Sequence, residues 1–180
     1  MRRVVRYGAG SLIVLAMGFF ITPVSAQEKC HDISGQFANM RYCVTSVRAP
    51  QGGETFSPEH LLATGDGAWC TAADGPQTVT LHLKPRVPLR TIYLTNGYAK
   101  SVETFRQNGR VKRLQIETDR GYRALLFPQD SRTSQKFMIE TGRYTWIKFT
   151  ILETTRGSTN PGVCISGLLL DLEEYGRDRS

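Results

Sequence analysis

The chain has 180 residues, 22% of them charged and 40% hydrophobic, and a formal net charge of +7 at pH 7. This length gives one domain that buries its own core, and the lack of an internal repeat excludes a repeat array. The positive charge is concentrated between Lys84 and Arg123. Such a segment suits an anionic glycan, a lipid headgroup or nucleic acid, or else forms a solvated strand face.

Residues 1–26 have the pattern of a cleaved signal peptide. Arginines open the segment, an apolar run follows from Leu12 to Ile21, and small residues precede Gln27. The apolar run of about ten residues is too short to cross a bilayer, which takes about twenty. The sequence therefore predicts a secreted or periplasmic protein with no membrane span in the mature chain. An uncleaved membrane anchor is the alternative.

The four cysteines all lie after the predicted cleavage site, at Cys30, Cys43, Cys70 and Cys164. An even number of cysteines in an oxidising compartment favours two disulfides. A zinc site is the rival interpretation. It is weaker because the chain has no Cys-x-x-Cys pair and only His31 lies near a cysteine.

Alternating apolar residues predict about eight short strands. In the first clear alternation Val79, Leu81 and Leu83 face one way, and Pro85 and Pro88 end the strand. The other predicted strands cover Cys43–Arg48, Arg90–Thr95, Val111–Thr118, Arg123–Phe127, Lys136–Glu140, Tyr144–Leu152 and Val163–Leu172. This spacing indicates an all-β fold, a sandwich or jelly roll over residues 42–175, with a polar tail at 176–180.

Two segments depart from the strand pattern. Residues 27–41 contain Gly35 and no sustained period, so we expect an irregular N-terminal segment tethered by its cysteines. Ser57 followed by Pro58 has the form of a helix start, which predicts one or two helical turns over His60–Ala63.

The fifteen residues from Asn96 to Arg110 are predicted to form a long ordered loop between two strands. The segment opens and closes with Asn-Gly, which supplies the positive φ of a turn. A loop of this length is usually functional or disordered, and its aromatic residues argue against disorder. Rings, amides and cations together suit a sugar or another polar ligand, and the candidates are Asn96, Tyr98, Lys100, Phe105, Arg106, Asn108 and Arg110. Alternatively, the rings plug the end of the sandwich and the amides cap turns.

Catalytic signatures are missing from the sequence. The three histidines, His31, His60 and His82, lie in no metal-binding or nucleophile motif, and there is no phosphate-cradling glycine loop and no Gly-x-Ser-x-Gly. A spatial pair of carboxylates for glycoside hydrolysis stays possible, although the acidic residues have basic neighbours that suit surface pairing. We predict a protein that is not an enzyme, with no cofactor and no metal.

Several short blocks occur in a fixed order along the chain. They are Pro50–Gly53, Phe56–Leu62, Ala68–Cys70, Asn96–Ser101, Asn108–Leu114 and Ile165–Leu168. With these blocks the chain resembles the discoidin-like module of streptococcal NAD-glycohydrolase toxins and of many exported bacterial proteins, the NADase-type glycan-binding or translocation domain. The resemblance covers about residues 42–175. It implies a galactose-binding-like jelly roll, ligand binding by the end loops, and a non-catalytic role.

The resemblance also implies which residues gather at the ligand-binding end. The family pattern brings Gln51 and Trp69 to the loop of Asn96–Arg110. We therefore expect a glycan or cell-envelope polysaccharide as the ligand. The alternative is a partner protein gripped by the same loops in envelope assembly, while nucleic acid is disfavoured.

The cysteine pairing follows from where the chain departs from these relatives. Many discoidin-like sandwiches hold calcium where an Asp-Gly loop meets a glutamate of the last strand, but here that strand reads Ile165-Ser166-Gly167. The resemblance places Cys70 and Cys164 on the two segments that the ion joins. It thus implies a Cys70–Cys164 disulfide and leaves Cys30 to pair with Cys43, out of three possible connectivities.

Overall fold

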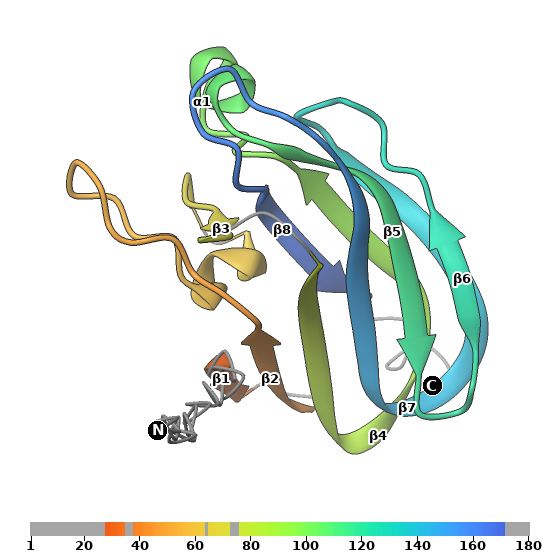
Figure 1. Cartoon of the computed structure of the whole chain (residues 1–180). Coiled ribbons are helices and arrows are strands. Elements are labelled where there is room, and N and C mark those ends of the chain that lie inside the picture. Colours follow the sequence, from red (N-terminus) through yellow and green to blue (C-terminus); the bar gives the residue numbers. More distant parts are fainter. Residues whose placement is uncertain (1–27, 35–37, 64, 73–75, 172–180) are drawn as a thin grey trace, which may run out of the picture.

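The computed structural model describes residues 28–34, 38–63, 65–72 and 76–171, so the predicted signal peptide and polar tail lie outside the described residues. In chain order the elements are β1 Lys29–Ser34, β2 Asn39–Val44, the 3₁₀ helix η1 Pro58–Leu62, β3 Trp69–Cys70, β4 Gln77–Asn96, α1 Val102–Gln107, β5 Arg110–Thr118, β6 Arg123–Leu126, β7 Ser134–Thr155 and β8 Cys164–Leu170. Figure 1 shows how these elements are arranged. The all-β fold is confirmed.

All the strand pairs are antiparallel, and two long strands connect the layers. The strand order is β1-β2-β4-β7-β5-β6, and β8 pairs with both β3 and β4. Strand β4 pairs with β2 as far as Lys84 and with β8 from Ile92 onward. Strand β7 follows β4 through both halves, so the two bent strands carry the sheet from one layer into the other (Figure 1).

The two prolines of β4 do not end the strand, contrary to the sequence-based prediction. Strand β4 runs unbroken through Pro85 and Pro88. Its pairing with β2 stops at Lys84 and its pairing with β8 starts at Ile92, so no described strand pairs with this side of β4 at the two prolines. A proline without an N–H is tolerated at such an unpaired edge. The same continuity joins the two predicted strands between Lys136 and Leu152 into β7.

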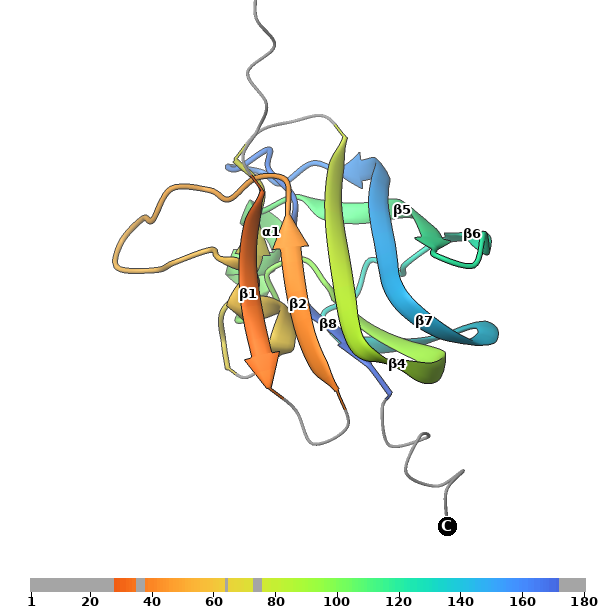
Figure 2. The same cartoon turned by 90° about the horizontal axis from the view of Figure 1, so that it is seen from below.

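The N-terminal segment is a β-hairpin rather than the irregular segment that we expected. Strands β1 and β2 pair antiparallel and extend the sheet beside β4 (Figure 2). Met40, Tyr42 and Val44 alternate toward the core, a period that is too short to recognise so close to Gly35. The predicted first strand at Cys43–Arg48 is therefore misplaced, since β2 ends at Val44.

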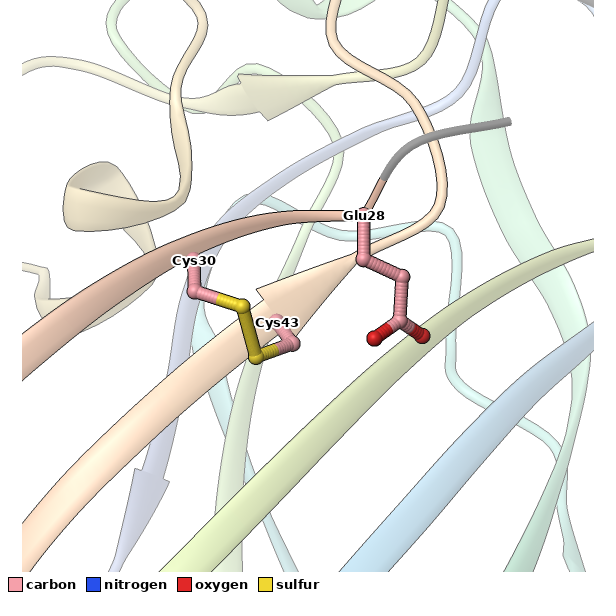
Figure 3. Close-up of side chains that lie close together, drawn as sticks. All are labelled: Glu28, Cys30 and Cys43. Carbon is pink, nitrogen blue, oxygen red and sulfur yellow. A yellow bond between two sulfur atoms is a disulfide. The ribbon is translucent and has the colours of Figure 1, made fainter. Parts of the chain in front are cut away.

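The hairpin is closed by one of the two predicted disulfides. Cys30 and Cys43 lie directly opposite each other in the β1–β2 register and are bonded, with an S–S distance of 2.07 Å. Glu28 lies beside them, and Figure 3 shows its carboxylate near the two sulfurs. Because both sulfurs are used in the disulfide, this group offers no thiolate for a metal ion.

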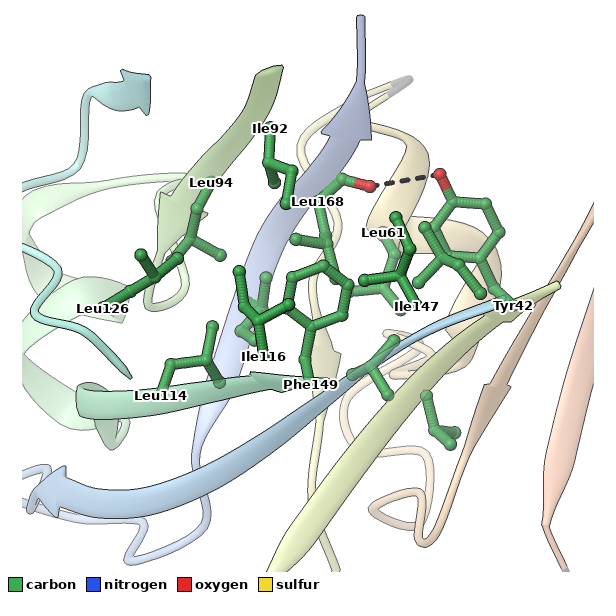
Figure 4. Packing of buried hydrophobic residues seen from close by; sticks show 14 of the residues in the cluster. Tyr42, Leu61, Ile92, Leu94, Leu114, Ile116, Leu126, Ile147, Phe149 and Leu168 are labelled. Atoms are coloured by element: carbon green, nitrogen blue, oxygen red, sulfur yellow. Dashed lines mark hydrogen bonds between the residues drawn. The ribbon is translucent and has the colours of Figure 1, made fainter. Parts of the chain in front are cut away.

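The main core cluster is formed by the inward faces of both layers (Figure 4), and a smaller cluster contains Phe56, Ala68, Cys70, Tyr98 and Cys164. The largest fully buried members of the main cluster are Trp69, Tyr42, Tyr144, Phe149, Leu61, Leu81, Leu83, Leu89, Ile92, Leu94, Leu114 and Ile116. Burial of each such side chain stabilises the fold by about 1.5–3 kcal/mol. The hydroxyl of Tyr42 donates to the carbonyl oxygen of Leu168 at 3.1 Å, so its polar atom is satisfied inside the core.

Helices are few and short. The predicted turns after Ser57-Pro58 form η1, which ends at Leu62 and is capped by Ala63 with a left-handed φ of 52°. Strands β4 and β5 are joined by a segment that contains the six-residue α1, which the sequence analysis treated as loop. No helix among the described residues is long and apolar enough to cross a bilayer.

Candidate functional site

The segment between β4 and β5 is anchored at its base by a buried amide. Asn96 has no exposed surface, and its Nδ2 donates to the carbonyl oxygen of Val111 at 2.8 Å. The backbone N–H of Val111 donates back to Asn96 Oδ1 at 2.9 Å. The two hydrogen bonds fix the start of the segment against its end, as a pair of backbone groups does in a β-ladder.

Helix α1 is stabilised because backbone groups at both of its ends have hydrogen-bond partners. The Thr104 N–H donates to Ser101 Oγ at 3.0 Å, and the Ser101 N–H donates to Thr104 Oγ1 at 2.9 Å, which makes a capping box. At the other end, the N–H groups of Ser158 and Asn160 donate to the carbonyl oxygens of Arg106 and Gln107. The turn after β7 thus holds the helix in place.

Phe105 and Arg110 contact each other under the helix. The guanidinium carbon of Arg110 lies 4.9 Å from the centre of the Phe105 ring, and Arg110 Nε lies 2.5 Å from Asp130 Oδ1. The Arg110 side chain is only 12% exposed. Gly97 lies close to both side chains with φ at +71°, and a Cβ there would lie 2.7 Å from Phe105 and 2.9 Å from Arg110. Both predicted ligand residues therefore hold the segment together.

Tyr98 links the segment to the turn after β2. Its ring packs edge-on against Phe56 with centroids 6.2 Å apart, and only 4% of the residue is exposed. The hydroxyl donates to Glu54 Oε2 at 3.0 Å. Burial, together with this carboxylate, raises the pKa of Tyr98. The aromatic face that we expected to meet a ligand is covered by protein.

Arg48 is an internal cation that the sequence analysis missed. Its Nη1 donates to Asn108 Oδ1 at 2.7 Å, and its guanidinium carbon lies 4.6 Å from the centre of the Phe56 ring. Its Nη2 lies 3.1 Å from Cys164 Sγ. Burial lowers the pKa of Arg48. One side chain thus ties the turn after β2 to the base of α1 and to the last strand.

The second disulfide lies under this arginine. Cys70 and Cys164 are bonded with an S–S distance of 2.06 Å, and neither residue has any exposed surface. They also face each other in the register of β3 and β8. Both predicted disulfides are therefore confirmed.

The nine predicted ligand residues separate into two groups. Trp69, Asn96, Tyr98 and Asn108 are buried, and the Trp69 indole donates internally to Ser46 O at 2.9 Å. Phe105 and Arg110 are half-buried, and Gln51, Lys100 and Arg106 are exposed. The sequence alone could not distinguish the buried residues from the exposed ones, because aromatic rings and amides are equally suited to packing inside the fold and to binding a ligand.

The segments after β2, between β4 and β5 and between β6 and β7 carry five polar side chains that we call the loop-end surface: Gln51, Glu54, Lys100, Arg106 and Arg132. Lys100 Nζ lies 2.5 Å from Glu54 Oε1, and Arg132 Nη1 approaches the carbonyl oxygen of Ala99 at 3.5 Å. Among the described residues, no carboxylate forms an ion pair with Arg106 or Arg132. Glu54 and Arg132 were missed because they lie outside the predicted loop.

A pocket of about 200 Å³ opens beside Lys100. It is lined by Ala63, Gly65, Asp66, Gly67, Thr95, Ala99, Lys100 and Ser166. The Ser166 hydroxyl is already used, because it donates to Gly97 O at 3.0 Å and accepts from the Ala99 N–H at 2.8 Å. With one carboxylate and one ammonium group, this lining is poor for calcium, which prefers several carboxylate oxygens. That the site holds no metal stays a prediction.

The basic segment from Lys84 to Arg123 is not a uniform cationic face. Arg86 pairs with Asp119 at 3.6 Å, and Arg123 pairs with Glu117 at 2.9 Å. Lys112, Arg113 and Arg110 also have carboxylate partners. Exposed pairs of this kind contribute little stability, but they reduce the positive field that would attract a polyanion.

Comparison with solved structures shows the same fold in sugar-binding modules. The chain is 16% identical to CpGH89CBM32-5 of Clostridium perfringens, solved with GalNAc-beta-1,3-galactose, with a TM-score of 0.56 over 73% of this chain and 94% of that one. It is also 16% identical to the family 32 module of C. perfringens NanJ, solved with galactose, with a TM-score of 0.53 over 73% and 92%. At these identities the likeness shows the fold alone.

A third similar structure is the C-terminal domain of a chitobiase from Bacteroides fragilis, at 15% identity and a TM-score of 0.54 over 78% of this chain and 96% of that one. No curated protein matches the sequence. The model of the NAD glycohydrolase translocation F5/8 type C domain matches residues 34–171, which include both sheet layers and the loop-end surface. The chain belongs to this family of discoidin-like domains.

Proposed function

We propose that the chain is an exported, non-catalytic carbohydrate-binding module that holds its ligand at the loop-end surface. The observation that carries the proposal is the rigid presentation of polar side chains there. Helix α1 is capped at both ends, and Asn96 and Arg48 anchor the segment from below. A site whose side chains are already ordered loses less entropy when a ligand binds.

The chemistry of the surface favours a sugar that carries acidic groups. Arg106 and Arg132 have no carboxylate partner among the described residues, and a guanidinium binds a carboxylate or phosphate through two parallel hydrogen bonds. Gln51 and the Glu54–Lys100 pair add donors and acceptors that suit sugar hydroxyls. Because Tyr98 and Trp69 are buried, recognition at this end relies on hydrogen bonds rather than on ring stacking.

Export is supported by the cysteines. Both pairs are oxidised, and disulfides persist in secreted and periplasmic proteins rather than in the cytosol. Together with the signal-peptide pattern of residues 1–26, this supports a mature chain that acts in the periplasm or outside the cell. The solved neighbours bound to galactose-containing sugars support the ligand class.

A glycan array probed with the mature chain tests the proposal. We expect binding to a subset of glycans, enriched in those with uronic or sialic acids, and lost in the Arg106→Ala, Arg132→Ala double variant. The Arg120→Ala variant is the matched control, because Arg120 is an exposed arginine on the turn between β5 and β6. A folded protein that binds no glycan, or one that retrieves only a protein partner through these residues, would overturn the proposal.

A further inference from the structure

The broad face of the sheet that turns away from the core carries a second set of polar and aromatic side chains. Ile147, Phe149 and Ile151 of β7 point into the core, so Trp146 and Lys148 point outward. Figure 2 looks onto this region, where β1, β2, β4 and β7 lie side by side. None of the residues already assigned to the loop-end surface belongs to these four strands.

Trp146 stands in a row of outward side chains that crosses the sheet. The register places Trp146 opposite His82, and His82 opposite Arg41. Adjacent strands lie about 4.8 Å apart, so the row from Trp146 to Arg41 spans about 10 Å. Trp146 is partly exposed, and no described residue accepts a hydrogen bond from its indole N–H. By contrast, Trp69 is fully buried and bonded to Ser46.

The next row supplies hydroxyl and charged groups. Thr80 lies opposite Lys148, and Lys148 lies opposite Glu117. Glu117 also accepts from Arg123 at 2.9 Å, and Lys148 Nζ lies 3.3 Å from the same carboxylate. Lys148 and Arg123 thus both form ion pairs with Glu117, which lies on the same face.

The first row has its own ion pair. Arg41 donates to Asp32 through two bonds, Nε to Oδ1 at 2.6 Å and Nη2 to Oδ2 at 2.9 Å. Arg41, Lys148 and Arg123 are thus paired with carboxylates, and Lys84 is the cation of the neighbouring pocket with no carboxylate partner among the described residues, so the pairing reduces the attraction of the face for a polyanion. A neutral ligand rich in hydroxyl groups matches this charge pattern better.

A pocket opens on the same face. It has a volume of about 600 Å³ and is lined by β1, β2 and the edge of β4, including Asp32, Arg41, His82 and Lys84. The pocket reaches His82, which is the register partner of Trp146. A pocket of this volume close to a partly exposed ring has room for more than one sugar unit.

We propose that this face is a second carbohydrate site, which binds a neutral oligosaccharide with one sugar ring against Trp146 and further hydroxyl groups against His82 and Arg41. The flat apolar face of a pyranose stacks on an indole, whose N–H stays free to donate to a hydroxyl. Charged side chains that form ion pairs can still donate hydrogen bonds to sugar hydroxyls or accept hydrogen bonds from them. This inference rests on the proposed function only for the class of ligand, a carbohydrate. It differs from the proposed function in the location of the site and in the charge of the sugar.

The test uses the two tryptophans of the chain as reporters. The ¹⁵N-labelled mature protein is titrated with soluble neutral hexasaccharides: cellohexaose, xylohexaose, mannohexaose and chitohexaose. At least one is expected to shift the indole N–H signal of Trp146 and to leave that of Trp69 unchanged. The Trp146→Ala variant should bind that sugar at least about tenfold more weakly, and Trp146→Phe, which keeps a flat ring, should lose less.

Gln115→Ala is the matched control. Gln115 is an uncharged residue of the same outer face and lies opposite Thr150, four residues and about 13 Å along β7 from Trp146. The affinity of the Gln115→Ala variant for the same hexasaccharide should stay within about twofold of that of the wild type. Folding of each variant is checked by its amide spectrum.

The possible results separate the two sites. Binding that shifts the amide signals of Lys100 and Arg106 but not the Trp146 indole overturns the sheet-face site and leaves the loop-end site standing. A Trp146 shift without loop-end shifts supports the sheet-face site alone. If all four hexasaccharides leave Trp146 unmoved, or if its signal moves with protein concentration before sugar is added, the face is not a site for neutral glycans.

Discussion

Lys100 and Glu54 meet across the end of the sandwich, with Lys100 Nζ 2.5 Å from Glu54 Oε1. The second oxygen of the same carboxylate accepts from the Tyr98 hydroxyl at 3.0 Å. One acid of the turn after β2 therefore binds two residues of the segment that carries α1. The hydrogen bond from Lys100, and next the one from Tyr98, lowers the pKa of Glu54.

This contact predicts a pH dependence. The pKa of Glu54 is lower in the folded state than in the unfolded state. The ionised carboxylate therefore contributes to the free energy of unfolding at pH values above the ordinary glutamate pKa of about 4.3. The contribution is lost as the pH falls through the lowered value. A ¹³C titration of the Glu54 carboxyl should give a midpoint below the ordinary value, and the midpoint should rise in Lys100→Met. An unchanged midpoint in that variant would show that Lys100 is not the cause.

The two disulfides should contribute differently to stability. They close loops with sequence separations of 94 for Cys70–Cys164 and 13 for Cys30–Cys43. On the chain-entropy model, their removal costs about 4–5 and about 3 kcal/mol respectively. Urea unfolding of the two double alanine variants measures the difference in the free energy of unfolding. A larger loss for the Cys30–Cys43 variant would contradict the entropic explanation.

Gly97 is predicted to tolerate alanine poorly. Its φ of +71° opposes a side chain, and so does the Phe105 ring, which would lie 2.7 Å from an alanine Cβ. Gly121 is the control, because its φ is +77° and nothing lies within 4 Å. Gly121→Ala should cost about 1–2 kcal/mol, and Gly97→Ala about 1–3 kcal/mol more. Equal losses by thermal unfolding would mean that the ring moves freely.

Asn96 should be needed for stability rather than for contact with a ligand. The Asn96→Ala change leaves the backbone N–H and carbonyl of Val111 without their buried partners, which costs about 2–4 kcal/mol. Asn160→Ala removes one half-buried bond to Asn108 and should cost about 1 kcal/mol or less. If Asn96→Ala abolishes glycan binding at full stability, Asn96 contacts the ligand after all.

The sequence predicted the parts of the fold that follow from local pattern. Alternation of Val79, Leu81 and Leu83 found the core face of β4, because that period depends only on neighbouring residues. Ser57 and Pro58 found the start of η1 for the same reason. The disulfides came from the resemblance, since spacing alone leaves three connectivities open.

Other features depend on contacts distant in sequence and were missed. Whether Pro85 ends a strand depends on where β2 and β8 stop pairing with β4, which local pattern does not reveal. Arg48 gains its role from Asn108 and Cys164, sixty or more positions away. Trp69 and Trp146 look alike in sequence, yet one is core and the other lies on an open face.

The central claim is that the loop-end surface binds a glycan through its unpaired arginines. Isothermal titration of the strongest array ligand into wild type, Arg106→Ala, Arg132→Ala and the control Arg120→Ala measures this directly. We expect Kd to rise by about tenfold or more for each of the first two variants, which is about 1.4 kcal/mol, and to stay within about twofold for Arg120→Ala. Equal affinity of all four proteins for that ligand would contradict the claim.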